Sequence, residues 1–312
     1  MQTRQLGQFQ VSVVGLGCNN FGMTIDEAAT KAVVDAALDA GINYFDTADI
    51  YGGTKSEQFL GRALGSRRDD IVLATKFGHS MGTPEGRKGG SRSWIMEAVD
   101  ASLQRLGTDR IDHIQIHEPD AATPIEETLG ALNELVQAGK VVELGCSNFS
   151  ATQLDDAANA SQGGALPPFR TVQNRYSVLY RAPEKDGVLG ACERLGVGFV
   201  PFFPLESGLL TGKYTKGADV PEGSRLANPR FGKQFLSDDR LDQAQLLSDY
   251  AAERGHNLLE LALSWLVSNP TISTVIAGAT KPEQIAANTA AANAWAMTAQ
   301  ERSEIDALLT LG

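Results

Sequence analysis

Cysteine is scarce in this sequence: Cys18, Cys146 and Cys192 are the only three among 312 residues. An odd, widely spaced set does not make the disulfide framework of a small secreted domain and is typical of a protein in a reducing compartment. Long apolar runs are also lacking, since none approaches the roughly 20 residues that a membrane span needs. We therefore expect a soluble, cytoplasmic protein with no membrane partner.

Positive charge is in short supply too. Lys and Arg number 27 against 38 Asp and Glu, which gives a formal net charge of −11. Nucleic acids and anionic membranes are bound through clustered Lys and Arg, so neither is an expected partner. Apolar residues, in contrast, make up 42% of the chain, and charged residues 21%. That composition suits a large globular core and excludes a disordered or fibrous chain.

A short apolar strand followed by a helix is the unit that recurs along the chain. The strands are continuous apolar runs rather than alternating ones, as expected when both faces of a sheet are covered. Eight such strands are predicted, at 13–16, 43–45, 71–75, 111–116, 141–146, 171–174, 198–203 and 274–276. The helices predicted between them lie between Asp26 and Gly41 and at 56–64, 93–106, 125–138, 151–160 and 184–195.

Eight strand–helix units in 312 residues favour a (β/α)8 TIM barrel over an open, doubly wound sheet. Two short runs around Gly7 predict an N-terminal β-hairpin. Because no Pro- or Ser-rich linker divides the chain, residues 1–312 are predicted to form a single domain. The segments 79–92 and 212–239 are predicted to be long loops that shape a pocket. Additional helices are expected near the C-terminus, at 241–253, 258–267, 282–291 and 299–309.

Polar side chains occupy the predicted carboxyl ends of the strands, the rim on which barrel enzymes build their sites. Asp46 ends the second strand with Tyr51 just beyond it, and Lys76 and His117 follow the third and fourth strands. A lysine in that position needs a carboxylate partner, and Asp46 is the expected one. The ammonium group is expected to lower the pKa of Tyr51 from about 10. These four residues predict a site that polarises a carbonyl group and donates a proton.

Other interpretations of the same residues stay open at this point. Asp46 alone also fits a helix cap, and Tyr51 a half-buried aromatic residue. His113 and His117 lie four residues apart on one strand, which also fits a metal-dependent barrel hydrolase, but no other strand end supplies a histidine and we expect no metal. His113 and Cys146 are each more simply read as packed side chains. The spacing Gly15-x-Gly17-x4-Gly22 is wrong for a Rossmann phosphate loop.

Seven motifs in one order cover nearly the whole chain. They are Asp46-x4-Tyr51-Gly52, Thr75-Lys76, Ile116-His117-x-Pro119-Asp120, Gly145-x-Ser147-Asn148, Gln173-Asn174, Pro204-Leu205 with the run 208–213 (Gly-Leu-Leu-Thr-Gly-Lys), and Gly278-Ala279-x2-Pro282-x-Gln284-x3-Asn288. With these motifs the chain resembles the aldo-keto reductase superfamily. The resemblance implies a (β/α)8 barrel that reduces carbonyl groups with a nicotinamide cofactor.

The resemblance also implies a role for each matching residue. Tyr51 would be the general acid, assisted by Lys76 with Asp46, and His117 would orient the carbonyl group of an aldehyde or ketone. The positions that bind cofactor in the family correspond to the following residues. Ser147, Asn148, Gln173 and Phe202 would contact the nicotinamide, and Leu205, Gly208, Leu209, Gly212 and Lys213 the pyrophosphate. Gly278, Lys281, Gln284 and Asn288 would contact the adenosine. Residues expected to line the substrate pocket are Asn19, Asn20 and Phe21.

Cofactor preference is predicted from one charge. Lys281 is the only basic residue between Gly278 and Asn288, and a 2′-phosphate needs a cation, so NADP(H) is expected to be preferred and NAD(H) to be the weaker alternative. The expected partner is a small carbonyl compound or alcohol, and the sequence predicts no oligomeric state. Relatives that serve as regulatory subunits of ion channels imply an alternative, a barrel that binds cofactor with little turnover.

Overall fold

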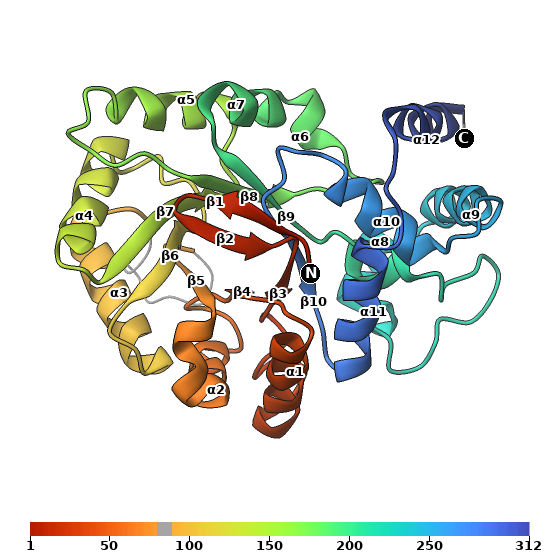
Figure 1. Ribbon diagram of the computed structural model, residues 1–312, viewed down its shortest axis with the longest axis horizontal. Helices are drawn as coiled ribbons and strands as arrows, with labels where there is room; N and C mark the ends of the chain where they lie inside the picture. The colour runs from red at the N-terminus through yellow and green to blue at the C-terminus, as the bar shows by residue number, and fades with distance from the viewer. Residues whose placement is uncertain (80–88, 312) are drawn as a thin grey trace.

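The computed structural model describes residues 1–79 and 89–311, and its centre is a barrel of parallel strands (Figure 1). The eight strands of the sheet run in the order β10-β3-β4-β5-β6-β7-β8-β9, and every neighbouring pair is parallel. Their bounds are β3 (Val14–Gly17), β4 (Tyr44–Asp46), β5 (Val72–Phe77), β6 (Ile111–Ile116), β7 (Val141–Ser147), β8 (Thr171–Arg175), β9 (Gly198–Phe202) and β10 (Val275–Gly278).

The seam between β9 and β10 is joined just before β10 begins. The N–H of Phe199 donates to the carbonyl of Thr271 at 2.9 Å, and the N–H of Ser273 donates to the carbonyl of Phe199 at 2.9 Å. These bonds bring the first and last strands of the sheet together, as a barrel requires. The predicted (β/α)8 TIM barrel is therefore confirmed.

Helices surround the strands in Figure 1. Their bounds are α1 (Glu27–Asp39), α2 (Lys55–Leu64), α3 (Arg92–Leu106), α4 (Ile125–Gln137), α5 (Ala151–Ala160), α6 (Ala182–Lys185), α7 (Val188–Leu195), α8 (Pro229–Phe235), α9 (Asp238–Ala252), α10 (Leu258–Val267), α11 (Pro282–Ala292) and α12 (Ala299–Leu311), with 3₁₀ helices η1 (Gly65–Asp70), η2 (Glu206–Thr211) and η3 (Arg225–Ala227). Among the described residues, no helix is long and apolar enough to cross a membrane.

The N-terminal hairpin, β1 (Thr3–Leu6) with β2 (Phe9–Ser12), lies over the barrel axis at the end where the strands begin (Figure 1). The guanidinium group of Arg4 donates to the carbonyls of Asn269 at 2.8 Å and Ile272 at 2.6 Å, and also to that of Val267. The predicted hairpin is confirmed, and it leaves the opposite rim, where the strands end, for a site.

Local sequence explains where several helices begin. Asp26 caps α1, because its carboxylate accepts from the N–H of Ala29 at 2.9 Å. Ser150 with Gln153 and Asn257 with Glu260 form capping boxes at α5 and α10, in which each side chain bonds the backbone N–H of the other residue. These contacts satisfy N–H groups that the first turn of a helix leaves without partners.

Two expectations about helices and loops were wrong. The single helix predicted at 184–195 is two, because Gly187, with φ of 78°, interrupts it between α6 and α7. The segment 212–239 is not a plain loop, since it contains η3 and α8, with Pro229 in the first turn of α8. The predicted pocket loop 79–92 falls mostly outside the described residues, which omit 80–88.

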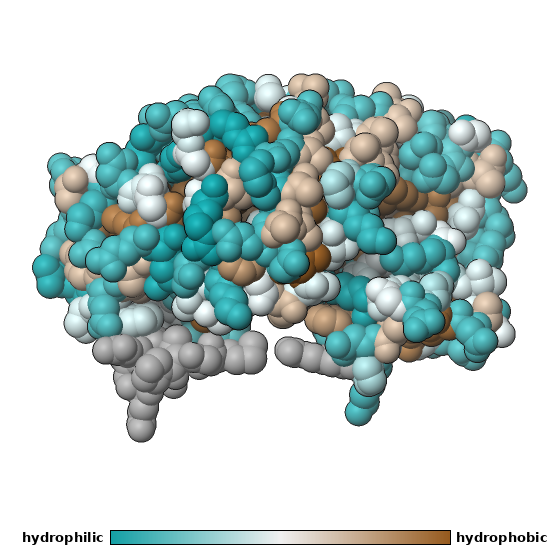
Figure 2. All heavy atoms as spheres, turned by 90° about the horizontal axis from the view of Figure 1, so that it is seen from below, coloured by the Kyte–Doolittle hydropathy of each residue, from teal (hydrophilic) through white to brown (hydrophobic). Residues whose placement is uncertain are grey.

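One face of the molecule is mainly polar. Figure 2 shows a face on which hydrophilic residues dominate and apolar residues are scattered. Among the described residues, the large hydrophobic side chains classed as exposed are Met1, Met23 and Val220, which lie far apart in the sequence. Scattered apolar residues of this kind are normal on a folded protein.

Candidate active site

Lys76 and Asp46 form a buried ion pair where β5 and β4 end. The side chain of Lys76 is 0% exposed and that of Asp46 3% exposed, and Nζ of the lysine lies 2.5 Å from Oδ2 of the aspartate. Nζ also donates to the carbonyl of Thr47 at 2.9 Å. Burial opposes the charge of Lys76, but Asp46 and then Tyr51 outweigh it, so its pKa is raised. The ammonium group is therefore kept charged inside the barrel.

Tyr51 joins this pair through its hydroxyl group. Nζ of Lys76 lies 3.4 Å from the Tyr51 oxygen, and the rings of Tyr51 and His117 meet edge to face with centroids 5.8 Å apart. The expected direction of the Tyr51 pKa was wrong. Lys76 does lower it, but burial is the larger effect and raises the pKa above its ordinary value. The phenol is thus protonated at neutral pH.

Gln115 is a member of the cluster that the sequence interpretation missed. Its side-chain amide donates to Oδ1 of Asp46 at 3.1 Å, and the amide of Gln173 donates to the same oxygen at 3.0 Å. The two amides also touch each other, with Nε2 of Gln173 3.4 Å from Oε1 of Gln115. Period-two alternation along β6 was the available signal, because it places Gln115 on the same face as His117.

His117 presents a neutral imidazole beside Tyr51. Burial first, then the charges of Lys76 and His79, hold its pKa well below its ordinary value. Its Nδ1 is buried and has no hydrogen-bond partner among the described residues. The ring of His79 packs edge to face on that of His117 at 4.7 Å, and Nε2 of His79 lies 3.1 Å from Glu118. A buried nitrogen without a partner is available to a ligand.

His113 does not belong to this site. Its ring is fully buried, with Nδ1 2.8 Å from the hydroxyl of Tyr44 and Nε2 2.9 Å from that of Thr171. Burial lowers its pKa to about 3, so it is a neutral core residue, as its simpler interpretation predicted. Cys146 is likewise fully buried, and burial raises the pKa of its thiol well above the usual value. Neither is placed to act as a metal ligand or nucleophile.

The residues carried over to a cofactor lie along the ends of consecutive strands. Ser147 ends β7 and Asn148 follows it, and Gln173 lies in β8 beside Ser147, whose hydroxyl donates to the Gln173 carbonyl at 2.8 Å. Asn148 has φ of 62° and donates through its side chain to the carbonyl of His117 at 3.0 Å. Phe202 ends β9. This group therefore faces the same rim as Tyr51.

The other carried-over residues continue around that rim. Leu205, Gly208, Leu209, Gly212 and Lys213 lie in and around η2, after β9. Gly278 ends β10, Lys281 immediately precedes α11, and Gln284 and Asn288 lie on α11. Gly208 has φ of 99°, a conformation that favours glycine, and Nζ of Lys213 lies beside it, 3.4 Å from where a Cβ would stand.

The three residues predicted to line the substrate pocket, Asn19, Asn20 and Phe21, differ in their burial and contacts. Phe21 is fully buried in the hydrophobic core, and Asn20 is 4% exposed. Asn20 donates to the carbonyl of Ala279 at 3.3 Å and accepts from Nη1 of Arg225 at 3.2 Å. A Cβ at Gly278 would lie 3.4 Å from Oδ1 of Asn19. Arg225, which sequence reasoning did not single out, thus reaches the end of β10 from the long 212–239 segment.

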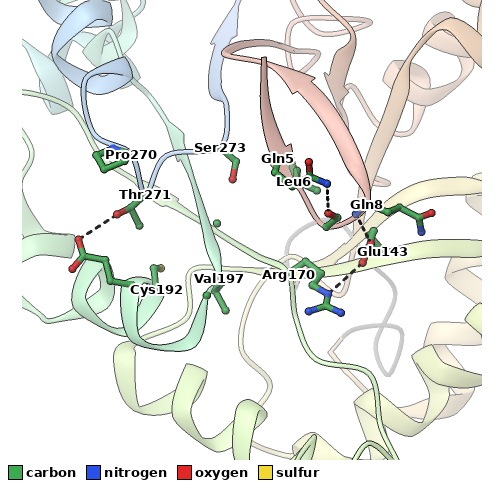
Figure 3. Close-up of a pocket in the computed structure, with 14 residues that line it drawn as sticks. Gln5, Leu6, Gln8, Glu143, Arg170, Cys192, Val197, Pro270, Thr271 and Ser273 are labelled. Carbon is green, nitrogen blue, oxygen red and sulfur yellow. Dashed lines mark hydrogen bonds and ion pairs between the residues drawn. The ribbon is translucent and has the colours of Figure 1, made fainter. Parts of the chain in front are cut away.

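A large hollow lies at the opposite end of the barrel. Its volume is about 760 Å³, and it is lined by the β1–β2 turn, Glu143, Arg170 and the segment before β10 (Figure 3). Arg170 and Glu143 lie 3.7 Å apart there, at the ends where the strands begin. The four-residue cluster around Lys76 is at the other rim, so size does not identify the candidate active site.

Comparison with known proteins agrees with this geometry. The aldo/keto reductase family matches residues 13–310. The chain belongs to this family. Its barrel, its N-terminal hairpin and the buried lysine–aspartate pair beside a tyrosine and a neutral histidine therefore all occur in an aldo/keto reductase.

Relatives within the family carry different names. A probable voltage-gated potassium channel subunit beta of Oryza sativa subsp. japonica is 37% identical over 92% of this chain and 90% of that protein. The L-glyceraldehyde 3-phosphate reductase of Escherichia coli (strain K12) is 33% identical over 98% and 92%. Aldo-keto reductase YhdN of Bacillus subtilis (strain 168) is 34% identical over 96% and 90%.

Proposed function

We propose that this protein is an NADPH-dependent oxidoreductase that reduces aldehyde or ketone carbonyls to alcohols, or catalyses the reverse reaction. The observation that carries the proposal is the buried cluster in which Lys76 touches both Asp46 and Tyr51. Such a cluster supplies a proton but contains no nucleophile. The bound cofactor would supply the hydride, from C4 of its nicotinamide.

Tyr51 acts as the general acid in this proposal. Its raised pKa keeps the phenol protonated at neutral pH, so a proton is available for the carbonyl oxygen. As the proton leaves, the ammonium group of Lys76 stabilises the phenolate. Asp46 keeps that ammonium charged and in position. His117, neutral and with Nδ1 free of a partner among the described residues, orients the carbonyl group.

The rim residues fit a dinucleotide. Ser147, Asn148, Gln173 and Phe202 would hold the nicotinamide; Leu205, Gly208, Leu209, Gly212 and Lys213 the pyrophosphate; and Gly278, Lys281, Gln284 and Asn288 the adenosine. Several buried polar atoms along this rim lack partners among the described residues, including the hydroxyl of Ser207 and Nε of Arg225. Orphaned groups of this kind are explained when a polar ligand occupies the site.

Two cations support a preference for NADPH. Lys281 lies just before α11, and Arg225 reaches Asn20, which bonds Ala279 at the end of β10. A guanidinium group is the better of the two for a phosphate, because it offers several donors in one plane. Lys281 and Arg225 are the residues that would hold the adenosine 2′-phosphate.

The decisive test is Tyr51→Phe, assayed with a panel of aldehydes and ketones. The variant should bind NADPH as the wild type does and lose turnover by about 10²-fold or more, because it lacks the general acid. Tyr250→Phe is the matched control, since Tyr250 bonds Glu304, which lies on α12, and should leave turnover unchanged. Full activity of Tyr51→Phe would exclude the mechanism.

A second candidate function is that of a cofactor-binding regulatory subunit. The similarity to a protein named as a probable potassium channel subunit beta favours it. The two functions differ in turnover. Steady reduction of a simple aromatic aldehyde supports the enzyme, whereas tight NADPH binding with no turnover of any compound in the panel supports the regulatory subunit.

A further inference from the structure

The turn after β9 has an unusual backbone. Phe203, Glu206 and Ser207 have φ values of 53°, 47° and 58°, and Gly208 follows with 99°. Left-handed backbone is costly for a residue with a Cβ atom, and it persists where the surrounding contacts determine it. Strain of this kind concentrates at ligand-binding sites. The contacts that hold this turn therefore bear on function.

The carboxylate of Glu206 is held from three directions. It is 0% exposed, and its Oε2 accepts from the guanidinium groups of Arg175 and Arg240. Its Oε1 accepts from the hydroxyl of Ser177 at 2.7 Å. Arg175 ends β8 and Arg240 lies in the first turn of α9. One side chain thus ties the strained turn to two neighbouring elements.

The two arginines continue into a row of aromatic rings. The ring centroid of Phe235 lies 4.9 Å from Cζ of Arg175 and 5.9 Å from Cζ of Arg240. Phe235 packs on Phe203 with centroids 5.4 Å apart, and Phe203 on Phe202 at 5.4 Å. Phe202 is the ring assigned to the nicotinamide. Contacts therefore run from the Glu206 carboxylate to both the turn and this ring.

We propose that Glu206 is a positioning residue of the dinucleotide site, which locks the 203–208 turn in the conformation that receives the pyrophosphate. One carboxylate between two guanidinium groups leaves a single positive charge beside the turn, which also favours an anion there. Without the carboxylate, the two arginines repel each other and the left-handed residues can relax. This inference rests on the proposed function, since it assumes that the turn binds a dinucleotide.

Glu206→Gln tests whether Glu206 holds the 203–208 turn in place, because this substitution removes the charge and keeps the shape of the side chain. NADPH binding to the full-length protein is titrated by fluorescence, and steady-state rates are measured with an aldehyde. We expect the Kd and the KM for NADPH to rise about tenfold, with kcat at saturating cofactor within threefold of the wild type, because the Lys76 cluster is intact. A rise in Kd smaller than threefold overturns the proposal.

Glu57→Gln is the matched control. Glu57 is also 0% exposed and bonds a guanidinium group, that of Arg105, at 2.6 Å, but it lies on α2. The Glu57→Gln variant should be less stable than the wild type and should keep the wild-type Kd for NADPH. An equal rise in Kd for both variants overturns the proposal, since the effect would then be general loosening. If the wild type binds neither NADPH nor NADH, the proposed function itself fails.

Arg240→Lys covers the case in which Glu206→Gln does not fold. The side chain of Arg240 is 21% exposed, and lysine keeps the charge but loses the guanidinium contact to Glu206. We expect its Kd for NADPH to rise at least threefold. A folded Arg240→Lys with the Kd of the wild type overturns the proposal.

Discussion

Nζ of Lys76 lies 2.5 Å from Oδ2 of Asp46, and both side chains are buried in the barrel. Removing one partner of a buried pair leaves the other without compensation, which costs about 3–5 kcal/mol. Replacing both with uncharged side chains avoids most of that cost. The pair therefore allows its contribution to stability to be separated from the catalytic role proposed for it.

Lys76→Met should destabilise the protein by about 3–5 kcal/mol and lower kcat/KM by about 10²-fold or more, because the Tyr51 phenolate loses its cation. The double variant Asp46→Asn with Lys76→Met should regain much of the stability and none of the activity. Urea unfolding measures the stability of each variant, and steady-state rates measure its activity. Lys140→Met, which breaks an exposed pair with Asp100, is the control and should change neither. Wild-type turnover in Lys76→Met would contradict the assigned role.

Asp49 is expected to make stability depend on pH. The residue is 7% exposed, and its Oδ1 has no partner among the described residues. Burial first, then the Glu57 carboxylate, raises its pKa from 3.8 to about 7. The folded protein thus holds a proton that the unfolded chain releases above pH about 4. This contribution to stability is complete below that pH and is lost as pH rises to about 7, by up to about 1.4 kcal/mol per unit.

Asp49→Asn should remove this dependence. The difference in unfolding free energy between wild type and variant, measured by urea titration from pH 4 to 8, should shift in favour of the variant as pH rises toward 7. Asp69→Asn is the control, because the Asp69 side chain is 77% exposed, and it should follow the wild-type profile. A difference that stays constant over the range would show that Asp49 is already ionised.

Arg225→Met should weaken the use of NADPH specifically. Loss of a charge-assisted bond to a phosphate costs about 1.5–3 kcal/mol, which is about 10- to 100-fold in kcat/KM. The kcat/KM for NADH, which lacks the 2′-phosphate, should change less than threefold. Lys216→Met is the control from the same long segment, since Lys216 pairs with Asp242 on the surface. Equal losses with both cofactors would place Arg225 away from the 2′-phosphate.

The arrangement of much of the candidate site was predictable because its residues directly follow apolar strands. Asp46, Lys76 and His117 each come at a strand end, and parallel strands of a barrel bring their ends to one rim. The pKa of Tyr51 was not predictable in direction, because the cost of burial competes with the nearby ammonium and depends on packing that the sequence does not display.

Arg225 and Glu206 show a different limit. Arg225 is 205 residues from the asparagine that it bonds, and no periodic pattern links the two. Glu206 follows Pro204-Leu205 in a matched motif, but a glutamate there is buried only because Arg175 and Arg240 converge on it from other elements. Long-range contacts of this kind follow from the folded arrangement rather than from local sequence.

The hairpin held by Arg4 closes the end of the barrel opposite Tyr51, and it begins at residue 3. A tag or surface linker attached at Met1 therefore emerges on the far side from the rim that carries Tyr51. Protein immobilised through that end should keep the rim that carries Tyr51 toward solution. Deleting the hairpin would remove Leu6 and Val11, which should expose the barrel side chains that pack against them, among them Tyr44, Val72 and Ile276, and thus cause aggregation.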